Sequence, residues 1–222
     1  MKKRTSDHAL LSIAMTAVLC AAVESSSNAP RLAAYRLDLN DHGNPSGFNP
    51  AQHLLLEFTP QEVRLGPPGK ILALRLTGYG YGSRLHPPAP ANPTVAGNRA
   101  EYHRRELTEW YLNEPPAVTQ GFTLSQRPGD AHPEEPLILA VTVADGAIPA
   151  RPAITPQGDA VLLNPSGGSR LRYGELHSHD ARGRELPSHL AVRGPQILLV
   201  VQDSGAEYPL VVEPTIASTL AE

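Results

Sequence analysis

The sequence has little cysteine and no excess of positive charge. Cys20 is the only cysteine among 222 residues, which excludes an internal disulfide and a zinc site built on several thiolates. Its 19 lysines and arginines face 22 acidic residues, for a net charge of −3. Because nucleic-acid binders concentrate basic side chains on one surface, we predict no nucleic-acid partner.

Common catalytic motifs are missing as well. The sequence contains no G-x-S-x-G nucleophile motif, no G-x-G-x-x-G phosphate loop and no D-x-D-x-D-G calcium loop. Glu106 and Glu109 flank a predicted strand, and Glu134 and Glu135 lie in a proline-rich loop. Neither pair has the apolar setting that raises the pKa of a catalytic acid. We therefore predict that the protein is not an enzyme and needs no cofactor.

Long helical patterns are absent after the N-terminal segment, and short strand patterns take their place. The 23 prolines and 18 glycines interrupt helices and central strands. Between them lie brief apolar runs such as His53–Phe58, Lys70–Gly82 and Leu137–Val143. Turn signals recur roughly every 8–12 residues, which is typical of all-β proteins. We predict an all-β, β-sandwich-like fold, formed either as one sandwich or as two packed sub-sandwiches.

The N-terminus has the three parts of a secretory signal peptide. Basic residues come first, a mostly apolar run follows at residues 9–23, and small residues precede a cleavage site after Ala22. The run is shorter than a membrane span requires. We predict a helical signal peptide at residues 1–22 and a secreted, cell-surface or periplasmic protein with no stable membrane span after cleavage. An uncleaved anchor and a lipoprotein acylated at Cys20 are the alternatives.

The remaining chain divides at turn-rich segments. Residues 23–50 are polar and are predicted to form an irregular leader, with one short strand at Ala34–Leu39. The oligomeric state is left open by the sequence. The other predicted segments are a first β-rich half at residues 51–126, a loop at 127–136, a second β-rich half at 137–216 and a tail at 217–222.

The stretch LRYGELHSHD carries a candidate metal site. His177 and His179 share one face of an extended strand, because side chains alternate along strands. Two such histidines can bind one metal ion with a third ligand, for which Asp180, His189 and Asp203 are candidates. A metal-dependent hydrolase at His177 and His179 is therefore one alternative. We favour a solvated strand face and predict no bound metal, because the nine histidines form no second cluster.

The phrase DARGRELP that follows is typical of a tight turn. Gly183 can adopt the positive φ that closes a type I turn with a bulge over Asp180–Gly183. We predict that the segments before and after this turn pair as a hairpin.

Aromatic residues suggest a second alternative, a carbohydrate-binding module. Tyr79 and Tyr81 fall on the same side of a strand that is bent by glycines, and Trp110 and Tyr111 are adjacent in LTEWYLNEP. If exposed, these four rings could stack on a sugar. The competing interpretation is that they pack in the core or along a sheet edge.

Several phrases resemble those of a known family in content and order. They are NRAEY followed by LTEWYLN, then QGFTL, DARGRELP and YPLVVEP, within a region from about Gln52 to Pro214. This region is similar to the N-terminal region of secreted bacterial FG-GAP repeat proteins, which are integrin-alpha-like. The resemblance implies a β-rich module that precedes a repeat array and has no catalytic residue to carry over. The sequence ends at Glu222, where repeats are expected to begin.

We therefore predict a secreted, non-catalytic structural or surface-interaction module. The expected partner class is a surface protein or a glycan.

Overall fold

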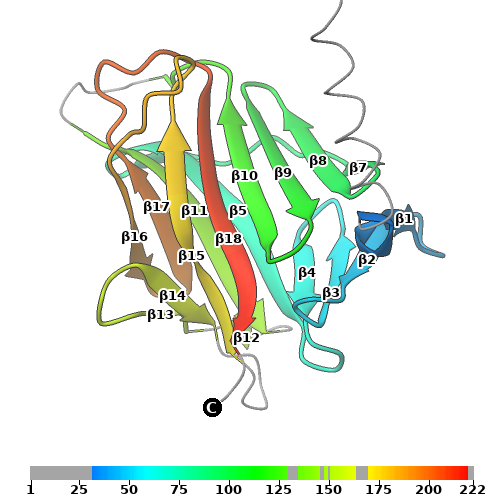
Figure 1. Cartoon of the computed structure of the whole chain (residues 1–222). Coiled ribbons are helices and arrows are strands. Elements are labelled where there is room, and N and C mark those ends of the chain that lie inside the picture. The colour runs from blue at the N-terminus through cyan, green and yellow to red at the C-terminus, as the bar shows by residue number, and fades with distance from the viewer. Residues whose placement is uncertain (1–31, 130–134, 146–147, 150, 164–169, 220–222) are drawn as a thin grey trace, which may run out of the picture.

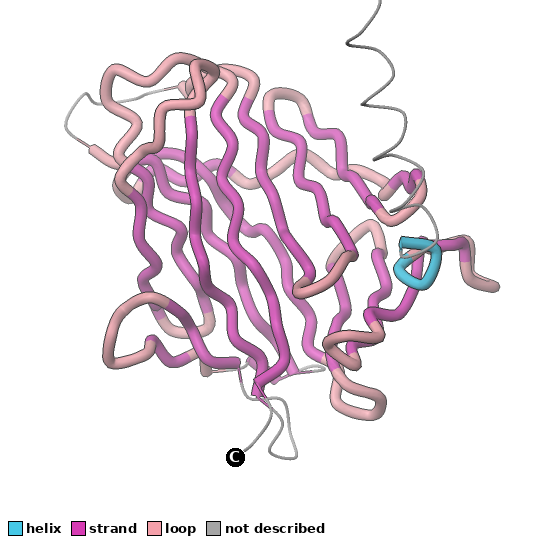
Figure 2. The backbone as a smooth tube through the Cα atoms, in the orientation of Figure 1, coloured by secondary structure: helices cyan, strands magenta, loops and turns pink. Residues whose placement is uncertain are grey.

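The computed structural model describes residues 32–129, 135–145, 148–149, 151–163 and 170–219. In these residues the chain forms two antiparallel β-sheets that pack face to face as a sandwich (Figure 1). One short 3₁₀ turn, η1 at Ala33–Tyr35, precedes the strands (Figure 2). The prediction of an all-β, sandwich-like fold is confirmed.

Sheet A is the larger of the two sheets and has ten strands. Its eight-strand path begins at the N-terminal edge with β1 (Leu37–Leu39), β2 (Pro45–Asn49), β3 (Leu54–Phe58) and β4 (Val63–Gly66). The path continues through β5 (Leu72–Tyr81), β11 (Leu137–Asp145), β17 (Gln196–Val201) and β16 (Ser188–Arg193). Two short strands lie off this path: β6 (Arg84–His86) pairs with β5, and β12 (Ile148–Pro149) pairs with β11.

Sheet B has eight strands. Its path begins with β13 (Ala153–Ile154), β14 (Ala160–Leu163), β15 (Arg170–His179) and β18 (Leu210–Thr219). It ends with β10 (Val118–Leu124), β9 (Leu107–Asn113), β8 (Arg99–Arg104) and β7 (Thr94–Ala96).

The predicted division of the chain into two β-rich halves does not match the sheets. Strands from before residue 127 and after residue 136 occur in both sheets, so the halves are interleaved in one sandwich rather than forming two sub-sandwiches. The predicted irregular leader contributes β1 and β2 to sheet A, and the predicted tail begins inside β18. The predicted loop at 127–136 does fall between β10 and β11, but the segments on its two sides are not separate units, because several strands pair with partners distant in the sequence.

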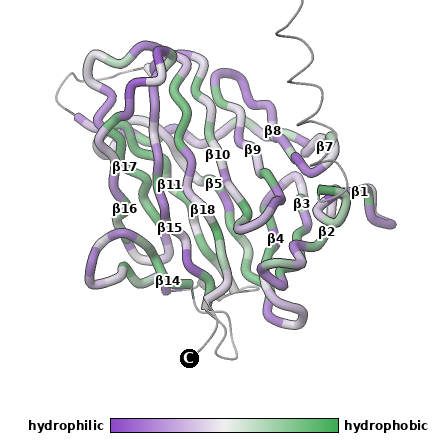
Figure 3. Tube along the Cα trace, viewed as in Figure 1, coloured by the Kyte–Doolittle hydropathy of each residue, from purple (hydrophilic) through white to green (hydrophobic). Residues whose placement is uncertain are grey.

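Alternation along the strands decides which side chains enter the core. In β3, Leu54, Leu56 and Phe58 are buried between the sheets, whereas Leu55 is 41% exposed on the outer face. Figure 3 shows hydrophobic and hydrophilic positions interspersed along the strands in the same way. Burial of the inward-facing apolar side chains stabilises the fold by roughly 25 cal/mol for each Å² removed from water.

The turn predicted at Asp180–Gly183 is present and closes a short hairpin, in which His179 forms an antiparallel bridge with Glu185 and the Leu186 N–H donates to the Ser178 carbonyl at 2.8 Å. Gly183 has a φ of 74°, and its N–H donates to the Asp180 carbonyl at 2.8 Å. β15 pairs with β14 and β18 in sheet B, whereas β16 pairs with β17 in sheet A. The predicted hairpin is therefore present but short, because the chain passes from sheet B to sheet A after Leu186.

The predicted signal peptide at residues 1–22 lies outside the described residues. Within the described part of the chain, no helix is long and apolar enough to cross a membrane.

Candidate ligand-binding groove

The histidines of the HSHD stretch lie on the outer face of β15. The His177 and His179 side chains are 69% and 40% exposed, as expected for a solvated strand face. Each faces its own carboxylate: His177 Nδ1 lies 3.9 Å from Glu185 Oε1, and His179 Nδ1 lies 3.9 Å from Glu213 Oε2. No group of three metal-binding side chains gathers among the described residues. The described geometry therefore gives no support to the metal-dependent hydrolase.

The Asp180 carboxylate is hydrogen-bonded within the turn that Asp180 begins. Its carboxylate accepts the backbone N–H groups of Arg182 and Arg184 at 3.0 Å each, and the Arg184 Nε at 3.1 Å. Desolvation acts to raise the pKa of Asp180, but these hydrogen bonds outweigh it and lower the pKa below its ordinary value. The role of Asp180 in this structure is to hold the turn. The other two candidate ligands lie elsewhere, with His189 exposed on β16 and Asp203 buried.

The four aromatic residues considered for sugar stacking are all buried. Tyr79, Tyr81 and Tyr111 belong to the core between the sheets, and Trp110 is 6% exposed. Tyr79 and Tyr81 do share a face, as predicted, but it is the inner face of sheet A. The proposal that these rings form an exposed stacking platform is therefore wrong.

Trp110 is buried although it lies on the outward side of β9. Its ring covers Gly121 of the neighbouring β10, where a Cβ atom would meet the ring at 2.1 Å. The Arg99 guanidinium lies 4.1 Å from the ring centroid, and the indole N–H donates to Thr123 Oγ1 at 3.1 Å. The ring thus packs flat against the sheet, between a glycine and an arginine.

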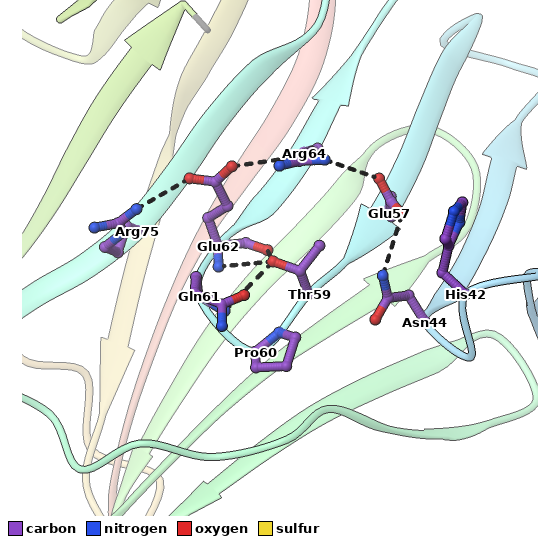
Figure 4. A pocket seen from close by; sticks show the side chains of 9 residues that line it. All are labelled: His42, Asn44, Glu57, Thr59, Pro60, Gln61, Glu62, Arg64 and Arg75. Carbon is purple, nitrogen blue, oxygen red and sulfur yellow. Dashed lines mark hydrogen bonds and ion pairs between the residues drawn. The ribbon is translucent and has the colours of Figure 1, made fainter. Parts of the chain in front are cut away.

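Hollows lie on the outer face of β2 to β5 and continue to the segment at residues 88–92 and Arg104 of β8. Three of them, of about 670, 590 and 520 Å³, adjoin one another. The first and second share Glu57 and Arg64, and the second and third share Pro60, Gln61 and Arg75. We call the three hollows together the sheet A groove, and Figure 4 shows its middle part.

A ladder of alternating charges crosses the middle of the groove (Figure 4). Glu57 Oε2 lies 3.6 Å from Arg64 Nη1, and Arg64 Nε donates to Glu62 Oε1 at 3.0 Å. Arg75 Nη2 then donates to Glu62 Oε2 at 3.1 Å. The hydrogen bond from Arg64 to Glu62 raises the pKa of Arg64 above its ordinary value, against the effect of desolvation. We call these four residues the charge ladder.

The strand register places the ladder across neighbouring strands. Glu57 of β3 pairs with Arg64 of β4, and Arg64 pairs with Ala73 of β5. At the N-terminal side, Asn40 and Asn44 donate to Glu57 Oε1 at 3.0 and 3.3 Å. Each polar side chain is therefore held in place by its neighbours.

Phe48, Leu55 and Ile71 lie beside the charge ladder, and we call them the apolar row. Phe48 of β2 pairs with Leu55 of β3, so the two side chains lie on the same face, and Ile71 precedes β5 in the same hollow. The Phe48 ring makes an edge-to-face contact with His53, with centroids 5.5 Å apart. The aromatic ring that lines this surface is therefore Phe48, which the sequence analysis did not select. The sequence does place Phe48 in a short segment just before the apolar run that forms β3.

The other end of the groove is formed by a proline-rich segment. Pro88, Pro90 and Asn92 line the third hollow together with Arg75 and Arg104. Arg104 donates through Nη1 to the carbonyl of Ala89, which ties this segment to β8. The Arg104 side chain is only 11% exposed.

Beneath Arg104 lies a buried carboxyl group that the sequence analysis missed. Glu109 is 3% exposed, and its carboxylate accepts from Arg104 Nη2 at 3.2 Å, the Tyr111 hydroxyl at 2.9 Å and Gln120 Nε2 at 3.1 Å. Burial raises the pKa of Glu109, and these three partners oppose the rise. The prediction that Glu109 lacks an apolar setting is therefore wrong. Alternation in Leu107–Asn113 places Glu109 on the same face as Leu107 and Tyr111, which could have identified it.

Comparison with models of protein families gives no match to this chain. Comparison with curated proteins gives no match either.

Proposed function

We propose that the protein is a non-catalytic surface-interaction module that binds its partner in the sheet A groove. The observation that carries this proposal is the pairing of a fixed charge ladder with an apolar row across four adjacent strands. Such a surface offers hydrogen-bonding groups and apolar contact side by side, as ligand sites do. Rigid strands hold the groups in place, which reduces the entropy lost on binding.

The chemistry of the carboxylates supports binding rather than proton transfer. Both ladder carboxylates are engaged by arginines at the surface. Glu109, whose burial raises its pKa, does not line the three hollows of the groove. A catalytic acid must reach the group that it protonates, and the cavity that Glu109 lines with Arg104 has a volume of only about 10 Å³, too small for a substrate.

The sequence patterns support a location outside the cytoplasm. We propose that residues 1–22 direct export and that the module is secreted, periplasmic or at the cell surface. The resemblance to the N-terminal region of FG-GAP repeat proteins supports the same role, in which a β-rich module accompanies a repeat array. The groove would then face partners at a cell surface.

Filling the groove is expected to abolish binding. Ser46 lies on the groove face opposite Glu57, so the substitution Ser46→Trp places an indole between the apolar row and the charge ladder. We expect the fluorescently labelled protein to bind saturably to cells of its source organism, and the Ser46→Trp variant to bind at least tenfold more weakly. Flow cytometry measures both. The matched control is Ile154→Trp on β13 of sheet B, where the native side chain is 44% exposed.

The proposal fails if both variants bind as the unsubstituted protein does, or if Ile154→Trp alone loses binding. It fails as well if the unsubstituted protein shows no saturable binding.

A further inference from the structure

We infer that the partner held in the sheet A groove is a neutral oligosaccharide chain. This inference rests on the proposed function, since it names the class of ligand for the same groove. It differs from the sugar-stacking hypothesis in its residues, because the rings of Tyr79, Tyr81, Trp110 and Tyr111 are buried.

The charge ladder suits a ligand that is polar but uncharged. Two glutamates and two arginines line the middle hollow, so their charges cancel. At the far end Arg104 is neutralised by Glu109. A groove without net charge gives no electrostatic advantage to a polyanion or a polycation. Charged polymers are therefore poor candidates for the occupant.

The ladder still has unused hydrogen-bonding capacity. A guanidinium group has about five N–H donors and a carboxylate has about four acceptor positions. Arg64 is 50% exposed and contacts Glu57 and Glu62, and Arg75 is 55% exposed and contacts Glu62. These contacts use only some of the N–H donors of each guanidinium group. Vicinal hydroxyl groups, which both donate and accept, can bridge such alternating donors and acceptors. A peptide backbone presents one donor and one acceptor per residue at wider spacing and matches the ladder less well.

The apolar row offers a surface that can contact the C–H face of a sugar ring. A sugar ring has a face of C–H groups, and aromatic rings favour such apolar surfaces. Phe48 is partly exposed in the hollow, with Leu55 and Ile71 beside it. His53 packs edge-to-face against the Phe48 ring.

The dimensions of the groove favour an extended ligand. Adjacent strands lie about 4.8 Å apart, so the face from β2 to β5 spans about 14 Å. A chain of a few sugar rings can cross this distance with hydroxyl groups along the ladder and one ring against Phe48.

The test uses intact cells treated in three ways before the labelled protein is added. Periodate, which cleaves vicinal diols, is expected to abolish binding, and proteinase K is expected to leave it unchanged. Binding is also expected to persist in about 1 M NaCl, where the Debye length is only about 3 Å. The substitution Phe48→Ala is expected to weaken binding about tenfold, through loss of apolar contact with the sugar. Arg64→Ala is expected to weaken it further, and Ile154→Ala serves as the matched control.

Each contrary outcome overturns the inference. Loss of binding after proteinase K but not after periodate indicates a protein partner or a second copy of the chain, and loss in salt indicates a charged ligand. If the Phe48→Ala and Arg64→Ala variants both bind as well as the unsubstituted protein, neither side chain contacts the ligand. If Ser46→Trp still abolishes binding in any of these cases, the proposed function survives and only the ligand class is wrong. Absence of binding to untreated cells contradicts both.

Discussion

Replacing Arg104 with methionine is expected to lower the free energy of unfolding by about 3–5 kcal/mol at pH 8. Arg104 is the positively charged partner of Glu109, which is buried to 3% exposure. Removing one partner of a buried ion pair leaves the other charge without compensation, and that is costlier than removing both. Methionine keeps most of the length of the arginine side chain. The decrease in the free energy of unfolding therefore comes mainly from the lost positive charge.

The effect of this substitution should depend on pH in a defined direction. Burial already raises the pKa of Glu109, and Arg104 is the strongest of the groups that oppose the rise. Without Arg104 the pKa rises further, so the folded state favours the protonated acid more strongly. For an acid with a raised pKa, stability is fully present below the unfolded pKa and falls as pH rises toward the folded value. The loss caused by Arg104→Met is therefore expected to be smaller at pH 5 than at pH 8.

Urea unfolding followed by tryptophan fluorescence measures this loss at both pH values. The double substitution Arg104→Met with Glu109→Leu is the control, and it should recover much of the lost stability because no buried charge remains. An equal loss at both pH values, or a larger loss at pH 5, would show that Glu109 is not the group left uncompensated.

Alkaline titration is expected to unfold the protein cooperatively between about pH 10 and 11.5. Burial raises the pKa of Tyr81 to about 12, and it raises the pKa of Tyr102, Tyr111 and Tyr173 as well. The negative charge of Glu109 adds to the rise for the last three. Because unfolded tyrosine ionises near pH 10, each such group stabilises the fold below pH 10 and loses that contribution as pH rises toward its folded pKa.

The size of this alkaline effect follows from the four buried rings. At pH 11 each one favours the unfolded chain by roughly 1.4 kcal/mol, about 5.6 kcal/mol in total. That is comparable with the whole stability of many domains. The absorbance of tyrosinate should therefore rise in step with the loss of β-sheet circular dichroism. Tyr173→Phe, which removes one of the four hydroxyl groups, should make the pH dependence less steep. Tyrosines that all titrate near pH 10 while the sheet signal is retained would contradict the prediction.

The strands could be predicted from the sequence because their evidence is local. Leu137–Val143 is a nearly continuous run of apolar residues, many of them β-formers, and β11 begins with it. Pairing between strands could not be predicted in the same way. β10 and β18 are neighbours in sheet B although Val118 pairs with Ile216, nearly a hundred residues later. This distance is why the two predicted halves were not separate units.

The candidate site depends on the register of consecutive strands and on which of their faces meets sheet B. Alternation correctly placed Tyr79 and Tyr81 on one side of a strand, but the side that faces the core is set by packing against sheet B. The groove exists because the register of four strands brings Phe48 beside Leu55 and Glu57 beside Arg64. These residues all lie in the continuous segment 48–75, but alternation within each strand does not set the register between them.

The most direct test of the account is to place a reporter in the groove. Cys20 is the only native cysteine, so in a Cys20→Ser background the substitution Ser46→Cys can be labelled with a small environment-sensitive fluorophore at one position. The same label at Ile154→Cys reports on the distant edge of sheet B. We predict that cells of the source organism, titrated into the labelled proteins, change the fluorescence at position 46 and leave it unchanged at position 154. Binding that changes the signal only at position 154, or at neither position, would contradict the assignment of the groove.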